Sequence, residues 1–198
     1  MKEAIIIFVR NPELGKVKTR LAAKIGNEKA LEVYIKLLEH TRDILSGLEA
    51  DKFVFGTEPF NLHWRGCINE IQTSGDLGSR MSNAFHLVFA KGYDRVIIIG
   101  SDCLELTKHH IEEAFAALNE NDIVIGPATD GGYYLLGMKK LHGQLFENKS
   151  WSTDLVFRQT MDSINQSGLP IFSLEWLNDI DTEKDLPANW KNIISVNS

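Results

Sequence analysis

Short, nearly continuous apolar runs alternate along the chain with longer stretches in which apolar residues recur every three or four positions. The strongest runs lie at residues 4–9 and 95–100, where Ile and Val dominate and the length is too short for a helix. Such runs are typical of strands that are buried on both faces of a sheet. Weaker runs predict further strands at 52–56, 68–73, 123–125, 133–138 and 171–174.

Amphipathic spacing predicts helices between these strands. Asn27 can cap a long helix that runs to about Gly47, after a short helix that begins at Thr19 and stops at Gly26. Further helices are predicted at 79–90, from Thr107 onward, and at 153–164. This alternation indicates an α/β fold, a three-layer α/β/α sandwich around a mostly parallel, mixed sheet. We expect residues 1–198 to form one such domain.

Composition excludes several classes of protein. The 198 residues are 43% hydrophobic and 24% charged, which is ordinary for a globular protein and unlike a disordered or fibrous one. The longest apolar run, residues 4–9, is too short for a membrane span or a signal-peptide core, so we expect a cytoplasmic protein without a membrane span. Cys67 and Cys103 cannot build a disulfide framework.

The charge is unevenly distributed. The net charge is −6, yet residues 10–24 hold five basic residues and one acidic residue, a local charge of +4. A basic segment in an acidic protein favours a small anionic ligand such as a phosphate over a nucleic acid. The segment also follows the first strand and enters a helix N-terminus, where α/β folds bind phosphates. The candidate phosphate-binding residues are Arg10, Lys16, Lys18 and Arg20, with a solvated basic turn as the alternative.

The segment lacks the familiar nucleotide-binding signatures. It matches neither the GxGxxG turn of dinucleotide-binding folds nor the GxxxxGK[ST] loop of P-loop nucleotidases. A second polar stretch, residues 74–81, joins a predicted strand to a predicted helix and contains two glycines, an Asp and an Arg. We assign its Gly78 and Arg80 to nucleotide binding. The alternative is a helix N-terminus capped by Ser79.

Three acidic turns are candidates for catalysis or metal binding. Asp102 follows the strand at 95–100, where an ionised carboxylate is costly to bury unless it is paired or binds a metal; the alternative is a cap. Asp130 lies in a turn whose Gly pair equally fits a hairpin, and Asp181 either binds a metal or caps the next turn. Carboxylates suit Mg²⁺ or Mn²⁺. We assign Asp102 and Asp130 to catalysis, and Asp102 and Asp181 to the metal.

Several short motifs, taken together and in order, resemble the DUF2064 family over nearly the whole chain, from about residue 4 to residue 187. The motifs are Phe8, Pro12 and Gly15 with Val17-Lys18-Thr19-Arg20-Leu21-Ala22; Gly75-Asp76-Leu77-Gly78 with Arg80-Met81; Ile99-Gly100-Ser101-Asp102-Cys103; Gly126-Pro127-Ala128 with Asp130-Gly131-Gly132-Tyr133-Tyr134-Leu135; Trp151-Ser152; and Asp179-Ile180-Asp181-Thr182 with Asp185-Leu186. This family is described as glycosyltransferase-like, with the GT-A nucleotide-diphospho-sugar transferase fold.

The resemblance implies a nucleotide above the carboxyl edge of the sheet, with a divalent cation between an Asp and the diphosphate. On this chain Lys16, Lys18 and Arg20 would then bind phosphate, and Asp102 would bind the metal. Many GT-A glycosyltransferases carry Asp-x-Asp, whereas residues 101–105 offer one Asp, and Glu105 three residues later. Leu104 also stands where many relatives have Pro. A missing carboxylate would come from Asp130 or Asp181.

The first hypothesis is therefore a Mg²⁺- or Mn²⁺-dependent, glycosyltransferase-like transferase that uses a nucleotide-diphospho-sugar donor and an unidentified acceptor, whose hydroxyl Asp130 positions or deprotonates. The enzymatic alternative is a nucleotidyltransferase that joins a nucleoside triphosphate to a phosphorylated small molecule and releases pyrophosphate. A non-catalytic nucleotide-binding module is the third possibility. The sequence leaves open the base, the sugar, the acceptor and the oligomeric state, and the segments expected to set specificity are residues 56–66 and 141–152.

Overall fold

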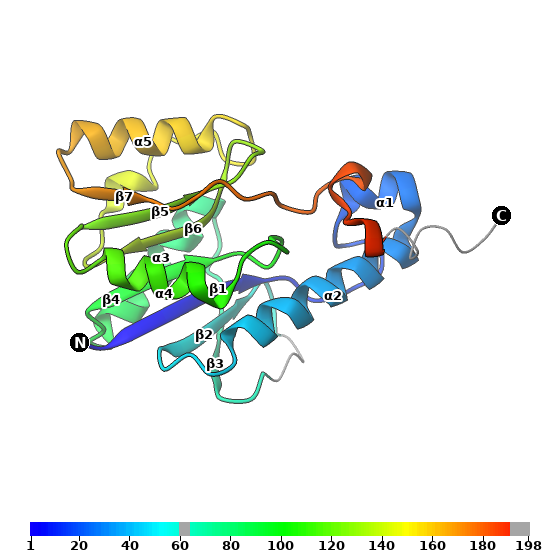
Figure 1. Cartoon of the computed structure of the whole chain (residues 1–198), viewed down its shortest axis with the longest axis horizontal. Helices are drawn as coiled ribbons and strands as arrows, with labels where there is room; N and C mark the ends of the chain where they lie inside the picture. The colour runs from blue at the N-terminus through cyan, green and yellow to red at the C-terminus, as the bar shows by residue number, and fades with distance from the viewer. Residues whose placement is uncertain (60–63, 191–198) are drawn as a thin grey trace.

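A computed structural model of the chain describes residues 1–59 and 64–190, and in that part seven strands form one sheet with helices on both sides (Figure 1). The strands are β1 (Glu3–Val9), β2 (Asp51–Gly56), β3 (Cys67–Ile71), β4 (Arg95–Ile99), β5 (Ile123–Pro127), β6 (Tyr133–Met138) and β7 (Ile171–Ser173). The helices are α1 (Thr19–Ile25), α2 (Asn27–Leu45), α3 (Leu77–Ala90), α4 (Lys108–Ala117) and α5 (Val156–Gln166), with short 3-10 turns η1 (Gly143–Leu145), η2 (Glu183–Asp185) and η3 (Ala188–Trp190).

The order of the strands confirms the predicted mostly parallel, mixed sheet. The strands lie in the order β3-β2-β1-β4-β6-β5-β7. All neighbours are parallel except β6, which runs antiparallel to both β4 and β5. The parallel strands β1, β2, β3 and β4 therefore end at one edge of the sheet, and β6 begins at that same edge.

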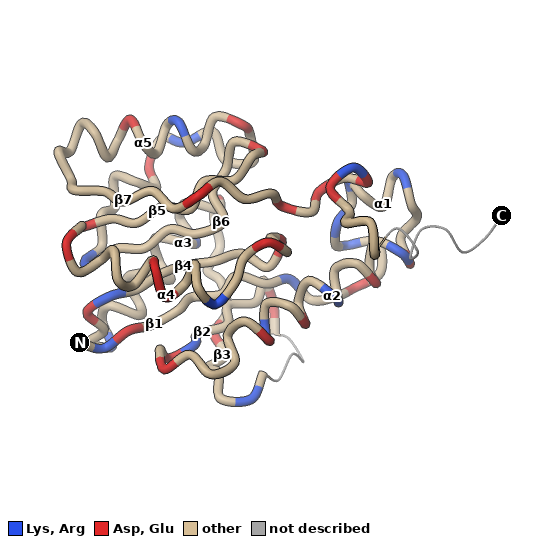
Figure 2. The backbone as a smooth tube through the Cα atoms, in the orientation of Figure 1, with Lys and Arg blue, Asp and Glu red and all other residues tan. Residues whose placement is uncertain are grey.

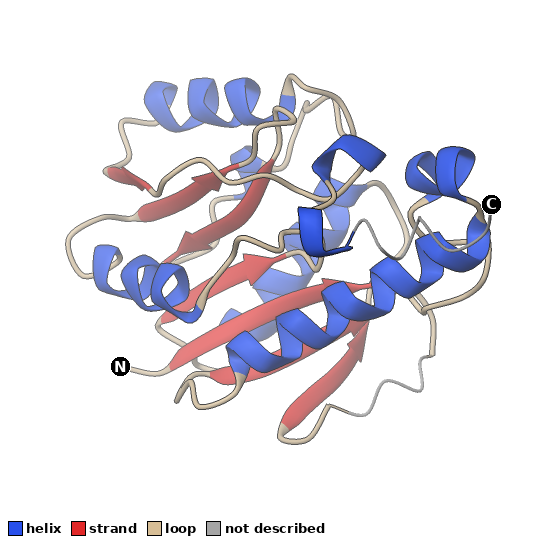
Figure 3. Cartoon of the chain, turned by 45° about the vertical axis from the view of Figure 1, so that its right-hand side comes forward, coloured by secondary structure: helices blue, strands red, loops and turns tan. Residues whose placement is uncertain are grey.

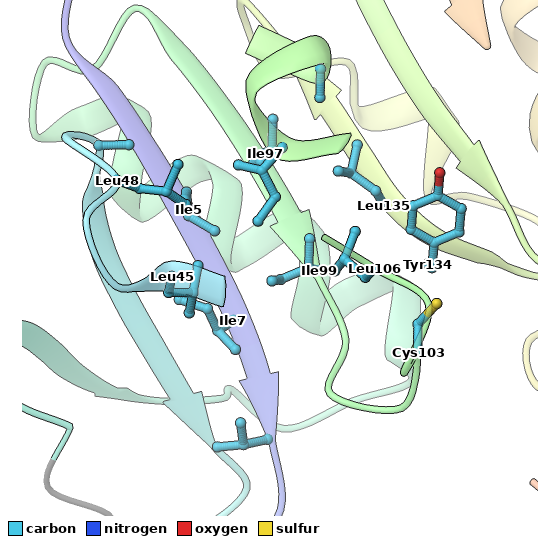
Figure 4. Close-up of a cluster of buried hydrophobic side chains, with 14 of the residues drawn as sticks. Ile5, Ile7, Leu45, Leu48, Ile97, Ile99, Cys103, Leu106, Tyr134 and Leu135 are labelled. Atoms are coloured by element: carbon cyan, nitrogen blue, oxygen red, sulfur yellow. The ribbon is translucent and has the colours of Figure 1, made fainter. Parts of the chain in front are cut away.

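Alternate residues of the strands form two cores, one on each face. Ile5 and Ile7 of β1 pack on the face covered by α2 and α4, and Figure 4 shows this cluster extending through Ile97 and Ile99 of β4. Ile6 points to the opposite face, where α3, η1 and α5 cover the sheet. Figure 3 shows α2 lying across the near face. Strands that are buried on both faces need apolar residues at every position, which explains their continuous apolar runs.

A third, smaller core lies beyond the carboxyl edge of the sheet. Leu21 of α1 packs with residues of α2 and with Ile180 and Leu186, which follow β7. Figure 1 shows the segment after β7 running away from the sheet to reach α1. The third core therefore holds the last part of the described chain beside the basic segment.

The predicted elements match the structure, with small corrections at their ends. Helix α3 begins at Leu77, and its cap is Asp76 and not Ser79: the Ser79 N–H donates to Asp76 Oδ1 at 2.8 Å. Helix α2 is preceded by Gly26 as its cap, so that Asn27 is already helical. Within residues 1–59 and 64–190, no helix combines the length and the apolar character that a membrane crossing requires.

Gly137, the next-to-last residue of β6, offers a test of the packing between β6 and its neighbours. A Cβ atom at this position would lie 2.6 Å from Val124 Cγ1 and 2.7 Å from Ile97 Cγ2. We expect Gly137→Ala to lower the free energy of unfolding by about 1–3 kcal/mol through overpacking, as measured by chemical denaturation. Gly143→Ala is the control, because the nearest atom to its Cβ would be 3.8 Å away. Equal stability of the two variants would contradict this packing.

Candidate active site

A cavity of about 540 Å³ opens at the carboxyl ends of the parallel strands. Its wall includes Arg10 after β1, Thr57 after β2, Gln72 after β3 and the loop after β4 that contains Asp102. Open α/β sheets bind ligands at this edge, and the volume is in the range of ordinary ligand pockets. The cavity is therefore the candidate active site.

One end of the cavity holds an ion pair network centred on Lys18. The Lys18 ammonium lies 2.8 Å from Asp102 Oδ1 and 3.4 Å from Asp181 Oδ1, and its side chain is only 4% exposed. Arg20 Nη1 lies 3.4 Å from Asp181 Oδ2 and is largely exposed. Figure 2 shows the acidic residues after β7 lying beside the basic residues near α1. The positive segment and two of the acidic turns thus meet in one place.

The backbone after β7 brings Asp181 to this end of the cavity. The Ile180 N–H donates to the Asp102 carbonyl oxygen at 2.9 Å, and the Ile180 side chain is buried in the third core. The Asn178 N–H donates to Glu105 Oε2 at 2.8 Å. Glu105 therefore braces this segment, which is a different role from that of a second metal-binding carboxylate.

Neither Asp102 nor Asp181 caps the element that follows it. Thr107 precedes α4, and its N–H donates to His110 Nδ1 at 3.0 Å. At η2 the Thr182 N–H donates to Asp185 Oδ2 at 2.6 Å. Both carboxylates are therefore left to face Lys18.

Asp179 lines the site as well, although the sequence motif that contains it gave a site role only to Asp181. Its carboxyl lines the cavity, and burial raises its pKa to about 7, an effect that the neighbouring carboxylates of Asp102, Asp130 and Asp181 reinforce and Lys18 opposes. The signal was the Asp179-Ile180-Asp181 alternation, since residues two apart in extended chain point to the same side. With Ile180 buried in the third core, both acids face the cavity.

Asp130 lies both in a hairpin turn and on the wall of the cavity. The turn joins β5 to β6, and Asp130 Oδ1 accepts a hydrogen bond from the Gly132 N–H at 2.8 Å. Gly131 has a φ of 90° and packs so closely on the Asp154 backbone that a side chain would not fit. Asp130 therefore does belong to a hairpin turn, as the alternative interpretation of the sequence proposed. The hydrogen bond within the turn uses its Oδ1 and not its Oδ2.

Aromatic and apolar side chains form another part of the cavity wall. Met81, Tyr133 and Trp151 belong to it, and the Tyr133 hydroxyl donates to Met81 Sδ, a weak acceptor, at 3.8 Å. Arg80 also lines the cavity, with its Nε donating to the Gly75 carbonyl at 2.8 Å. Gly78 is buried against Trp151, where a Cβ atom would lie 2.5 Å from the indole.

The structure thus brings together most of the residues predicted from the sequence and leaves two outside. Lining the cavity are Arg10, Lys18, Arg20, Arg80, Asp102, Asp130 and Asp181. Lys16 is exposed and pairs with Glu13 at 2.5 Å, away from the wall, and Gly78 supports Trp151 from behind it. Of the segment 56–66 expected to set specificity, residues 60–63 lie outside the described residues.

The donor atoms fit a divalent cation that arrives with phosphate groups. In the described part of the chain, no three His, Cys, Asp or Glu side chains are arranged to hold a metal ion by themselves. Asp102 and Asp181 face a common centre, since both carboxylates contact the Lys18 ammonium. Mg²⁺ usually takes one or two carboxylates and fills its remaining positions with water and phosphate oxygens. These two residues would hold the cation.

Comparison with known proteins identifies the family. The model of the family described as "Uncharacterized protein conserved in bacteria (DUF2064)" matches residues 40–153, more than half of the chain. The chain belongs to this family. The fold of this DUF2064 member is that of nucleotide-diphospho-sugar transferases: a crystal structure from Desulfovibrio desulfuricans G20, named as a candidate nucleotide-diphospho-sugar transferase, matches it with a TM-score of 0.86 at 30% identity, over 96% of this chain and 91% of that one.

Two further relatives differ more in sequence from this DUF2064 member. A 2-phospho-L-lactate guanylyltransferase of Methanocaldococcus vulcanius is 24% identical over 68% of this chain, and the matched region spans 61% of the length of that relative. A Mycobacterium tuberculosis H37Rv protein solved in complex with manganese is 10% identical, covers both chains completely and has a TM-score of 0.54, which shows a shared fold. The transferase names agree with the enzyme class expected from the sequence.

The raised pKa of Asp179 predicts how stability changes with pH. The unfolded chain ionises this carboxyl near its usual pKa of 3.8 and the folded protein near 7, so a rise in pH between these values favours unfolding. In metal-free buffer, the melting temperature of Asp179→Asn relative to the wild type should therefore rise from about pH 4 to about pH 7 and level off above it. Asp162→Asn, at an exposed position of α5, is the control. A difference that does not vary with pH would refute the shift.

Proposed function

We propose that this protein is a nucleotidyltransferase that joins a nucleoside triphosphate to a phosphorylated small molecule and releases pyrophosphate. The observation that carries the proposal is the meeting of Lys18, Asp102 and Asp181 at one end of a cavity that Arg10 and Arg20 also line. Such an end suits a chain of phosphates and a divalent cation. The guanylyltransferase relative favours this reaction over the glycosyl transfer that the sequence placed first.

The reaction requires charge stabilisation more than proton transfer. An oxygen of the acceptor phosphate forms a bond to the α-phosphorus, the bond from that phosphorus to the bridging oxygen breaks, and pyrophosphate leaves with the electron pair. Arg10, Lys18 and Arg20 bind the triphosphate oxygens and stabilise the charge that grows on the leaving group. A Mg²⁺ or Mn²⁺ ion at Asp102 and Asp181 supplies further charge neutralisation when bound. The manganese complex of the mycobacterial protein with this fold agrees with that choice of metal.

Asp130 separates this reaction from glycosyl transfer. A phosphate monoester is already largely ionised at neutral pH, with a second pKa of about 6, so its oxygen attacks without a general base. A hydroxyl acceptor needs one, and Asp130 is the carboxylate of the turn between β5 and β6 on the cavity wall. In nucleotidyl transfer its role is limited to the turn, where it accepts from the Gly132 N–H.

Glycosyl transfer from a nucleotide sugar is the second candidate function. The observation that favours it is the similarity over nearly the full chain to the Desulfovibrio structure named as a candidate nucleotide-diphospho-sugar transferase. The two reactions share the phosphate-binding end of the cavity and differ in their products, because glycosyl transfer releases a nucleoside diphosphate.

Pyrophosphate release tests the proposed reaction. The protein is incubated with each nucleoside triphosphate, Mg²⁺ or Mn²⁺ and a panel of phosphorylated small acids, and both pyrophosphate and the mass of the joined product are measured. We expect release with at least one pair, a loss of about 100-fold in Asp102→Asn and a loss of less than about tenfold in Asp130→Asn. Release of a nucleoside diphosphate from a nucleotide sugar, with strong loss in Asp130→Asn, would instead support the second candidate.

Nucleotide affinity tests the phosphate-binding assignment. Arg20 lines the cavity and Lys16 does not, although both lie in the basic segment. We expect Lys18→Ala and Arg20→Ala to weaken triphosphate binding by about five- to tenfold without unfolding the protein, and Lys16→Ala to change it less than about twofold. Calorimetry measures the affinity and circular dichroism the fold. Equal losses in Arg20→Ala and Lys16→Ala would mean that the segment acts as a diffuse positive field.

A further inference from the structure

We infer that Lys18 takes the place of the divalent cation in the free protein, so that bare metal binds poorly until the phosphates of a nucleotide draw the ammonium away. This inference rests on the proposed function, because it assumes that phosphates are the second partner of Lys18. It assigns Lys18 a positioning role at the metal site in addition to phosphate binding.

The geometry places the ammonium between the two carboxylates that would hold the metal. Lys18 Nζ lies 2.8 Å from Asp102 Oδ1 and 3.4 Å from Asp181 Oδ1. The Lys18 side chain is 4% exposed, whereas the carboxylates are 45% and 32% exposed. A nearly buried ammonium has lost most of its water and depends on these two partners. Lys18 is therefore a bound cation of the site and not a surface charge that happens to lie nearby.

The backbone fixes Lys18 in this position. Lys18 has φ 47° and ψ 44°, a left-handed conformation that is uncommon for a residue with a side chain, at the residue that precedes α1. Its carbonyl oxygen accepts the Ala22 N–H of α1 at 2.8 Å. The start of α1 thus aims the side chain at the loop after β4 and at the segment after β7. Such uncommon backbone conformations persist where the surrounding structure holds them, often at binding sites.

An ammonium and a divalent cation cannot both occupy the centre between these carboxylates. A metal at carboxylate bonding distance from Asp102 and Asp181 would face the positive charge of Lys18 at close range, and like charges in a partly buried site repel strongly. Arg20 does not compete in the same way, because within residues 1–59 and 64–190 its ion pair is with Asp181 and not with Asp102, and its side chain is 69% exposed. Lys18 is therefore the group that metal binding must displace.

Nucleotide phosphates make the displacement favourable. They offer the ammonium a new charged partner within the same cavity, and they complete the coordination of a metal that the described protein groups leave incomplete. The metal then neutralises Asp102 and Asp181 in place of Lys18. The expected order is that metal and nucleotide bind together, and that metal alone binds weakly.

Manganese binding in the absence of nucleotide tests this inference. The metal-free full-length protein is titrated with MnCl₂, and free Mn²⁺ is followed by electron paramagnetic resonance. We expect Lys18→Met to bind Mn²⁺ at least about tenfold more tightly than the wild type, with the gain lost in the double variant Lys18→Met/Asp102→Asn. Arg20→Met, which removes the same charge from an exposed position, should change the affinity less than about threefold.

Two results would overturn the inference. The first is unchanged or weaker Mn²⁺ binding in Lys18→Met, which would make Lys18 a support of the metal site or a structural tie. The second is an equal gain in Arg20→Met, which would reduce the effect to net charge. If Lys18→Met does not fold, Lys18→Gly replaces it, because glycine accepts the left-handed backbone. The titration contains no nucleotide, so a failure of pyrophosphate release and a failure of this inference are read independently.

Discussion

The contact between Ile180 and the loop after β4 is the constraint on which the polar site depends. One hydrogen bond, from the Ile180 N–H to the Asp102 carbonyl, and the burial of one side chain in the third core fix the path of the chain after β7. The acids on either side of Ile180 are then directed into the cavity. Without this contact, the sheet would still present Asp102 and Lys18 at its edge, but Asp179 and Asp181 would be missing from the cavity.

The pairing of opposite charges explains why the free protein is stable with so polar a site at the edge of an apolar sheet. Buried charges are costly unless they are paired, and here Lys18 is shared by two carboxylates while Asp179 keeps its proton to near neutral pH. These contacts neutralise the site in the absence of a ligand. Phosphate groups would nevertheless bind Lys18 more strongly, and a divalent cation would bind the carboxylates more strongly. A triphosphate with its cation carries both signs of charge, so the phosphates can replace the carboxylates as partners of Lys18 while the cation replaces Lys18 as the partner of the carboxylates.

Local sequence patterns predicted the elements of the fold and the location of the site, but not which of its residues pair with one another. Strands such as β1 and β4 were visible because burial on both faces demands an unbroken apolar run, and the ligand-binding edge followed from their ends. The pairing of Lys18 with Asp181 joins residues 163 positions apart, and no local pattern encodes it. Lys16 and Gly78 were assigned to the site from their residue types and from the motifs that contain them, although Lys16 pairs with Glu13 and Gly78 packs against Trp151.

The two ends of the cavity carry different kinds of information about function. The charged end suits phosphates and a cation, which nucleotidyl and glycosyl transfer have in common, so its geometry favours a nucleotide donor without choosing between the two reactions. The two reactions differ in whether the acceptor must lose a proton: a hydroxyl must, and an ionised phosphate need not. One carboxylate oxygen of Asp130 accepts a hydrogen bond from the Gly132 N–H, and the neighbouring Gly131 packs closely on the Asp154 backbone. These contacts limit how far Asp130 can move toward an acceptor hydroxyl. A carboxylate fixed in this way suits an acceptor that arrives already ionised, and this is the physical reason to favour a phosphate as the nucleophile.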